Sequence, residues 1–489
     1  MSERGRRPPI WEDGTCLGSI RPSSKGIYEV RACHTAAAVS ATFDEPNLVS
    51  CAGLVPVLRL AERAGLHPAA QQRVRLPASA GSAAANAGAK ITSVVAGMVA
   101  GADSIDDLGV IRHGALPELF GGIRAPSTLG AFLRGFTWGN VRQLDAVARE
   151  TLTGLSRHSP LLPGADSYAF LDVDSTISRV YGYAKQGAEY GYTRVRGLHP
   201  LLATISTPIA APVIAGTRLR RGSAGSAKGA ASFVAEAIST ARAAGATGIV
   251  LARMDSAFDS HAVVATCIRA GVRFSITTKQ TRPVRAAIEA IDPQGWVPIA
   301  YPHAIYDEAT GQWISDAEIA ETTYTAYRSR RKSEQITVRL IVRRVKDKNV
   351  VAEQGELFTA WRYHAFITDS TLQLAEAEKQ HRQHAIIEQV NADLKDSALA
   401  HMPSGSFTAN AAWLTLAAIA HNLTRAAGCL ASLLHARART GIIRRHLIVL
   451  PARIARRSRR IILRLPLNWA HRDAFSGLFT TTHAPPHTT

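Results

Sequence analysis

The pattern of apolar and polar positions changes twice along the chain. From Leu48 to about Ser156, apolar residues recur at helical spacing, which predicts a helical region. From residue 168 to 278, short apolar runs alternate with helical segments in the order β-β-β-α-β-α-β. This order predicts an α/β sheet with mixed strands. Beyond about residue 400 the pattern is helical again.

Two of the predicted strands end in acidic residues. The first carries Asp172 and Asp174 on the face opposite its apolar side chains, and the fourth ends in Asp255. A carboxylate at the end of a buried strand is costly unless something pairs with it, and a metal ion is one solution. A hydrogen-bonded Asp at a strand end is the other. The predicted strands are 168–174, 194–206, 212–219, 248–255 and 272–278, with helices at 227–244 and 261–270.

Between about residues 290 and 355 the α/β alternation is interrupted. This stretch is rich in Trp and Tyr, and it contains an alternating strand from Ile336 to Val342. Arg339 and Arg343 lie on the other face of that strand. These features predict a β-rich insertion with one basic face, after which residues 363–368 resume the sheet.

A predicted helix follows, from about residue 370 to 396. At about 100° per residue, His381, His384 and Lys395 fall within ~40° of Glu388, and the apolar side chains fall elsewhere. This face gathers a carboxylate, two imidazoles and an ammonium group. An ordinary solvated helix face would have the same composition.

Length and charge narrow the function classes. The 489 residues are enough for two to four domains, and a hydrophobic content of 46% is typical of a folded protein. The 57 Lys and Arg exceed the 38 Asp and Glu, which gives a net charge of +19. Nucleic acid is the expected partner for such an excess, and an anionic membrane surface is second. The stretch 437–472 alone contains eleven Arg.

Cysteine usage and apolar runs indicate a cytoplasmic protein. The five cysteines are widely spaced without a Cys-x-x-Cys pair, which suits reduced thiols and argues against a zinc ribbon. The first residues lack the apolar core of a signal peptide. The run Ile91–Ala102 is too short to span a bilayer. The longer run Ala411–Leu434 is interrupted by polar residues and predicts a buried helix.

The separated acids suggest a chemistry for this basic chain. Two Mg²⁺ ions about 3.5–4 Å apart need one bridging carboxylate and one on each side. Such a pair activates water or a 3′-hydroxyl and stabilises the leaving oxygen of a phosphodiester. Asp174, Asp255 and Glu388 on an α/β sheet therefore suggest phosphoryl transfer on nucleic acid.

The chain resembles bacterial insertion-sequence transposases of the D-D-E superfamily, in the cut-and-paste group with a β-rich insertion before the catalytic Glu. The resemblance covers about 165–400. That group has a Tyr-x-x-Arg-x-x-x-Glu-x-x-x-x-x-x-Lys signature, which here keeps Glu388 and Lys395 but has His381 and His384 in place of Tyr and Arg. The other motifs are Asp172-Val173-Asp174-Ser175-Thr176, Tyr181-Gly182-Tyr183-Ala184-Lys185-Gln186-Gly187, Gly191-Tyr192, Gly197-Leu198-His199-Pro200 and Arg253-Met254-Asp255-Ser256.

This resemblance implies a ribonuclease-H-like fold, also seen in retroviral integrases: a mixed five-stranded sheet with flanking helices and a β-rich insertion. Helical N-terminal and basic helical C-terminal regions flank it. The expected domains are a DNA-end-binding domain at 1–160, a catalytic core at 161–290 and 356–400, the insertion at 291–355 and the C-terminal region at 401–489.

The implied activity is that of a DNA transposase, which cleaves element ends and joins their 3′ ends to target DNA. Asp174, Asp255 and Glu388 would be the catalytic residues and would hold two Mg²⁺ ions, with Mn²⁺ as a substitute. Asp172 is the alternative to Asp174. Double-stranded DNA is the expected partner, bound by a dimer on paired ends in the bacterial nucleoid, with no membrane. The alternatives are a nuclease of the same fold without strand transfer and a domesticated DNA-binding protein.

Ten residues are predicted to contact DNA. Lys395, His381 and His384 would contact phosphates near the cleaved end. Trp313 follows a polar, turn-like stretch and is the candidate for stacking on a flipped base. The remaining predicted contacts are Arg339 and Arg343 in the insertion and Arg456, Arg457, Arg459 and Arg460 near the C-terminus.

Overall fold

A computed structural model describes residues 38–181, 184–191, 193–225, 227–308, 310–346, 360–458 and 460–485. Residues 47–489 belong to one compact unit, which holds every element described below. Among the predicted site residues, Arg459 lies outside the described ranges, as does the end of the predicted insertion after residue 346.

The region before the sheet is helical, as predicted. Its longest helix, α6, begins with a capping box in which Thr137 and Asn140 satisfy each other's backbone N–H groups. The helices are α1 (Leu54–Arg63), α2 (Leu66–Arg73), α3 (Ala87–Ala100), α4 (Leu116–Leu119), α5 (Pro126–Arg134) and α6 (Trp138–His158).

The predicted mixed sheet is present, with the predicted order of strands and helices. Its first five long strands lie in the spatial order β6-β5-β2-β7-β8. The β5 strand pairs antiparallel with β6 and β2, whereas β2, β7 and β8 run parallel. The elements are β2 (Tyr168–Ser175), β5 (Arg196–Ser206), β6 (Val213–Arg221), α7 (Ala230–Ala243), β7 (Ile249–Met254), α8 (His261–Arg269) and β8 (Arg273–Thr277).

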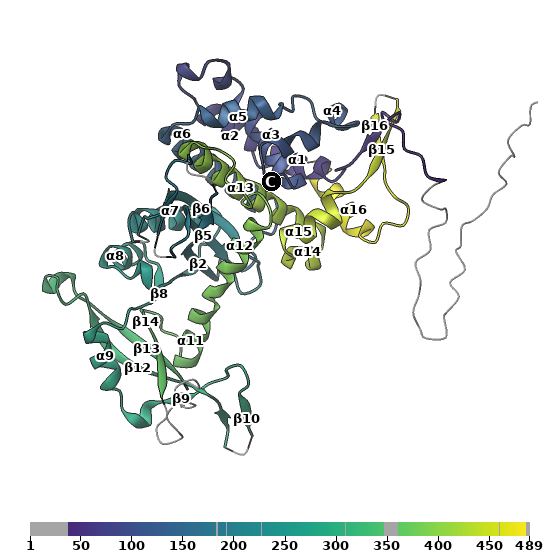
Figure 1. Cartoon of the computed structure of the whole chain (residues 1–489). Coiled ribbons are helices and arrows are strands. Elements are labelled where there is room, and N and C mark those ends of the chain that lie inside the picture. The colour runs from purple at the N-terminus through teal and green to yellow at the C-terminus, as the bar shows by residue number, and fades with distance from the viewer. Residues whose placement is uncertain are drawn as a thin grey trace, which may run out of the picture. The chain divides into compact units, whose positions relative to one another are not determined.

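The predicted insertion does not interrupt a five-stranded sheet but extends it. Strand β14 pairs antiparallel with β8, β13 pairs with β14, and β12 pairs with β13, and Figure 1 shows β12, β13 and β14 side by side beyond β8. The described part of the sheet has eleven strands in all. Long runs of paired apolar residues, such as Ile341 beside Phe366, drive this continuation. The added elements are α9 (Arg282–Glu289), β9 (Val297–Pro298), β12 (Ala317–Ala326), β13 (Ile336–Lys346) and β14 (Trp361–Thr368), with a separate hairpin of β10 (Ile305–Asp307) and β11 (Gln312–Ile314).

The helix predicted at 370–396 is two helices. A 3₁₀ turn at Gln383–Ala385 separates α11 (Leu374–Arg382) from α12 (Ile386–Lys395). Because a 3₁₀ turn has three residues per turn rather than 3.6, the direction of side chains before it differs from that of a continuous helix.

One buried helix joins the helical region to the sheet. Helix α13 (Phe407–Ala431) packs against α3 and α6 and also against β6 (Figure 1). Most of its residues are buried, which confirms the buried helix predicted from residue 411. In the described parts of the chain no single helix has the length and apolar character of a membrane span; the bent pair Ala78–Ala84 and Ala87–Ala100 has them only jointly.

The C-terminal region is not wholly helical, contrary to the prediction. A β-hairpin, β15 (Ala452–Arg457) and β16 (Arg460–Arg464), pairs with the short strand β1 (Leu48–Val49). Ala452 and Ile454 are buried against an apolar cluster that includes Val49, while arginines alternate with them. The helices of this region are α14 (Leu433–Arg437), α15 (Thr440–Ile443) and α16 (Arg472–His483).

Candidate active site

The predicted acids Asp174 and Asp255 stand at the same edge of the sheet. Strands β2 and β7 are parallel neighbours with Val173 opposite Met254, so Asp174 and Asp255 are the next residues of adjacent strands. Neighbouring strands lie about 4.8 Å apart. Asp255 also begins a 3₁₀ turn, because its carboxylate accepts a hydrogen bond of 3.0 Å from the Ala257 N–H.

Helix α12 brings the third acid to this edge. Asn391, one turn after Glu388, donates a hydrogen bond of 3.2 Å to the Asp174 carboxylate. Lys395, one further turn along, donates one of 2.6 Å to the Thr176 hydroxyl just beyond β2. Residues three and four apart share a helix face, so Glu388 lies on the side of α12 that faces the end of β2.

The pKa values of two of these carboxylates are raised in the folded protein. Burial is the main reason that the pKa of Asp174 is raised, and the negative charges of Asp255 and Glu388 raise it further. Burial likewise raises the pKa of Asp255. In the described ranges no Lys or Arg forms an ion pair with any of the three acids. Three neighbouring carboxylates without a paired cation are a donor set that fits divalent metal ions.

Asp172, the alternative to Asp174, is already fully paired. Its side chain is 0% exposed and accepts two hydrogen bonds of 2.7 Å from the guanidinium of Arg253. It also lies 2.8 Å from Nδ1 of His384. Arg253 in turn donates to the backbone carbonyl of Gln380 on α11, at 2.8 Å. A buried carboxylate with these partners has no oxygen left for a metal, so the geometry favours Asp174.

The network of Asp172, Arg253 and His384 connects the three acid-bearing elements. Asp172 lies two residues before Asp174, Arg253 lies two residues before Asp255, and His384 lies one turn before Glu388. The sequence does not predict this network, because Arg253 sits in an apolar run and its partner is 81 residues away. The only sequence signal is a charged residue at an inward position of a buried strand.

The two histidines are not positioned for the phosphate contacts predicted for them. His381 lies with its ring nitrogens 2.8 Å from the Ser275 hydroxyl and 3.0 Å from the Thr277 hydroxyl, and its ring stacks on Phe366. Burial lowers its pKa to about 3, so the ring is neutral. His384 is directed to Asp172. The 3₁₀ turn explains the difference, because the prediction assumed one continuous α-helix.

The predicted basic face of the insertion is neutralised by ion pairs. Arg339 donates to Glu321 at 2.8 Å on the neighbouring strand and to two backbone carbonyls after β14. Arg343 donates to the buried carboxylate of Glu378 on α11 at 2.6 Å. These donors are used within the protein, so a DNA contact by either side chain would have to replace an internal ion pair; that contact stays a prediction.

The remaining predicted DNA contacts lie in two hairpins. Trp313 is half-buried on β11, where its ring packs 5.0 Å from that of Tyr306. Arg457 and Arg460 are exposed and face each other at the tip of the β15–β16 hairpin, and exposed Arg456 pairs with Glu118. Arg459 lies between them but outside the described residues.

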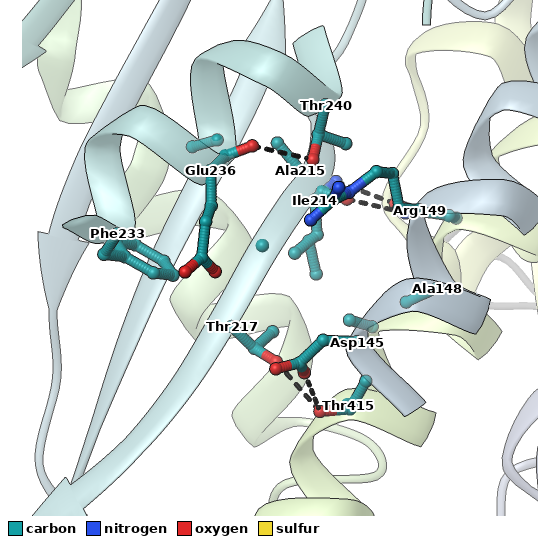
Figure 2. Close-up of a pocket in the computed structure, with 14 residues that line it drawn as sticks. Asp145, Ala148, Arg149, Ile214, Ala215, Thr217, Phe233, Glu236, Thr240 and Thr415 are labelled. Atoms are coloured by element: carbon teal, nitrogen blue, oxygen red, sulfur yellow. Dashed lines mark hydrogen bonds between the residues drawn. The ribbon is translucent and has the colours of Figure 1, made fainter. Parts of the chain in front are cut away.

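A separate small cavity lies where the helical region meets the sheet (Figure 2). It has a volume of about 30 Å³, enough for a water molecule, and lies between α6, β6, α7 and α13. Asp145 of α6 accepts a hydrogen bond of 3.2 Å from Thr415 of α13, as Figure 2 shows. Burial raises the pKa of Asp145 to about 6, although Arg142 lies 2.7 Å away. This cavity is a structural junction and contains none of the predicted catalytic acids.

Comparisons with known proteins identify the family. A family model described as "Transposase DDE domain group 1" matches residues 32–484. No curated protein matches the chain. The matched range includes all three predicted acids and most of the chain, so the protein belongs to the family of transposases with a DDE domain, group 1.

Proposed function

We propose that the protein binds the ends of a mobile DNA element, cleaves them and joins their 3′ ends to target DNA. The observation that carries this proposal is the approach of Asp174, Asp255 and Glu388 at one sheet edge without a paired cation among the described residues. The spatial strand order β6-β5-β2-β7-β8 supports a ribonuclease-H-like core. Family membership supports DNA as the substrate.

Asp174, Asp255 and Glu388 are the residues that would hold two Mg²⁺ ions, or Mn²⁺ in their place. When bound, such ions supply an activated water or 3′-hydroxyl and stabilise charge on the leaving oxygen. The protein's part is to hold the three carboxylates in place. Asn391 orients Asp174 through its 3.2 Å hydrogen bond, and the network of Asp172, Arg253 and His384 fixes the elements behind them.

Lys395 is the residue best placed to bind a DNA phosphate at this site. It is exposed, and its ammonium group hydrogen-bonds only the Thr176 hydroxyl among its described partners. Both groups lie beside Asp174. A phosphate next to the cleaved bond could take the place of the Thr176 hydroxyl as the acceptor for Lys395. Because the phosphate is charged, its hydrogen bond with the ammonium group would be stronger.

The decisive experiment is a strand-transfer assay with the purified protein, element-end DNA, Mg²⁺ and a target plasmid. Joined product supports transposition. Cleavage without joining would identify the alternative, a nuclease of this fold. End binding without cleavage would identify a domesticated DNA-binding protein.

We expect the tip of the β15–β16 hairpin to bind DNA phosphates. Changing Arg456, Arg457, Arg459 and Arg460 together to Gln should lower the slope of log affinity against log salt by about 0.9 for each phosphate that is no longer neutralised. The measurement is a titration of end DNA at several salt concentrations. Because Arg456 pairs with Glu118, its share should be the smallest. The control Arg269→Gln on α8 should leave the slope unchanged, and an unchanged slope in the quadruple variant would remove the hairpin from the interface.

We expect Trp313 to stack on a base that flips from the cleaved end. Stacking of a base on an aromatic ring contributes about 1–3 kcal/mol, so Trp313→Ala should slow release of flanking DNA by about 5- to 150-fold. First-strand nicking should persist. Both steps are read on labelled end DNA, and Trp313→Phe should restore most of the release rate. If Trp313→Ala releases flanking DNA at the normal rate, the ring only packs on Tyr306.

A further inference from the structure

Three histidines converge in the C-terminal region, away from the carboxylates. His435 of α14, His446 of the following π-helical turn and His471 just before α16 place one ring nitrogen each within 4.8 Å of one another. They come from three segments that are separated in sequence. Nothing in the transposition chemistry proposed above uses them.

The two ring nitrogens of His435 have different partners, and one of them is directed at a second histidine. Nδ1 of His435 lies 2.8 Å from the Ser432 hydroxyl, and the buried ring directs Nε2 toward Nδ1 of His446 at 3.2 Å. An oxygen partner on the second ring nitrogen is what metal-bound histidines usually have, because it fixes the tautomer. Trp469 holds the His446 segment by donating to its backbone carbonyl at 3.0 Å.

The spacing of the nitrogens also fits a metal. With Zn–N bonds of about 2.0–2.1 Å, two ligands of a tetrahedral zinc ion lie about 3.3–3.4 Å apart. The distance between the His435 and His446 nitrogens is 3.2 Å.

We propose that His435, His446 and His471 bind one Zn²⁺ ion, with water in the fourth position. Three imidazoles suit zinc, whereas Mg²⁺ prefers oxygen ligands, so this site is chemically distinct from the carboxylates. The rings of His446 and His471 are stacked 3.7 Å apart at 13°, and parallel rings cannot both direct a nitrogen at one ion. Zinc binding therefore turns one of these two rings.

Such an ion would hold the base of the arginine hairpin. The β15–β16 hairpin lies between His446 and His471 in the sequence, so a zinc ion bound by both closes the loop that carries it. His435 adds an anchor on α14, which follows the central helix α13. The ion would thus restrain the two ends of the hairpin segment without touching the hairpin itself.

Zinc content of the full-length protein tests this proposal. The untagged protein is dialysed against Zn²⁺ with Mg²⁺ in excess, to occupy the carboxylates, and then against buffer with Mg²⁺ alone. We expect one equivalent of zinc per chain in the wild type, and a tetrahedral visible spectrum when Co²⁺ replaces it. His471→Ala and His435→Ala should each lose that equivalent.

Two controls keep the result specific. His113→Ala removes an exposed histidine elsewhere and should retain the zinc. Asp174→Asn should also retain the zinc. Zinc retained in this variant shows that the ion is not bound by the carboxylates, and the result holds whether or not the proposed transposition is correct. If His435→Ala fails to fold, His471→Ala tests the proposal instead. His471 is only partly buried, so its loss should disturb the fold less. Absence of zinc in the wild type, or its retention in His471→Ala, would overturn the proposal.

Discussion

Asp255→Asn should reduce strand cleavage and joining by about 10²–10³-fold or more while end DNA still binds. The substitution keeps the shape of the side chain and its hydrogen bond from the Ala257 N–H, but removes the negative charge. Groups that stabilise transition-state charge each contribute on this scale, and a metal ligand acts through the metal. Asp174→Asn and Glu388→Gln should have the same effect. The assay is cleavage of labelled end DNA in Mg²⁺.

The matched control is Asp396→Asn, which changes an exposed acid next to Lys395. It should cleave normally, because Asp396 lies at the end of α12, two turns beyond Glu388. End binding, measured separately, should not fall in Asp255→Asn, since loss of a negative charge reduces repulsion of phosphates. Near-normal cleavage by Asp255→Asn would exclude the proposed triad.

The second large effect is on stability. Arg253→Met should lower the free energy of unfolding by about 3–5 kcal/mol, because it leaves the fully buried carboxylate of Asp172 without its guanidinium. Urea unfolding measures the loss. The exposed pair of Arg59 and Glu62 provides the contrast, and Arg59→Ala should cost at most about 1 kcal/mol.

A double variant separates the structural role of this pair from its role in catalysis. Replacing both partners, Asp172→Leu with Arg253→Met, removes the unpaired charge and should recover much of the lost stability. The double variant should nevertheless cleave DNA more slowly than the wild type. In this variant His384 lacks its acceptor, and the link from the turn before α12 to β2 is lost. Recovery of both stability and cleavage would mean that the network does not position Glu388.

The sequence predicted those parts of the fold that depend on local patterns. Short apolar runs that end in Asp174 and Asp255 gave the correct strands, and the parallel register then brought the two acids together. The polar face of α12 likewise gave Glu388 and Lys395. These predictions needed only the period of the pattern; that the two strands are parallel neighbours comes from the structure.

The same local patterns could not predict which residues far apart in the sequence pair with each other. The partners of Arg339 and Arg343 are acids on a neighbouring strand and on α11, so a strand face that looked basic is neutral in the structure. The break before α12 has no Gly or Pro to mark it. The β15–β16 hairpin was missed because its many arginines masked the alternation of buried Ala452 and Ile454 with exposed neighbours.

The central place of α13 has a consequence for synthesis on the ribosome. Helices α3 and α6 pack their apolar faces on α13, which begins only at Phe407, after the whole sheet. At about 5–20 residues per second, roughly tens of seconds pass between the emergence of α6 and that of α13. A nascent chain must meanwhile keep those faces exposed or covered by a chaperone. A chain terminated before Phe407 would therefore not complete the packing of its helical region.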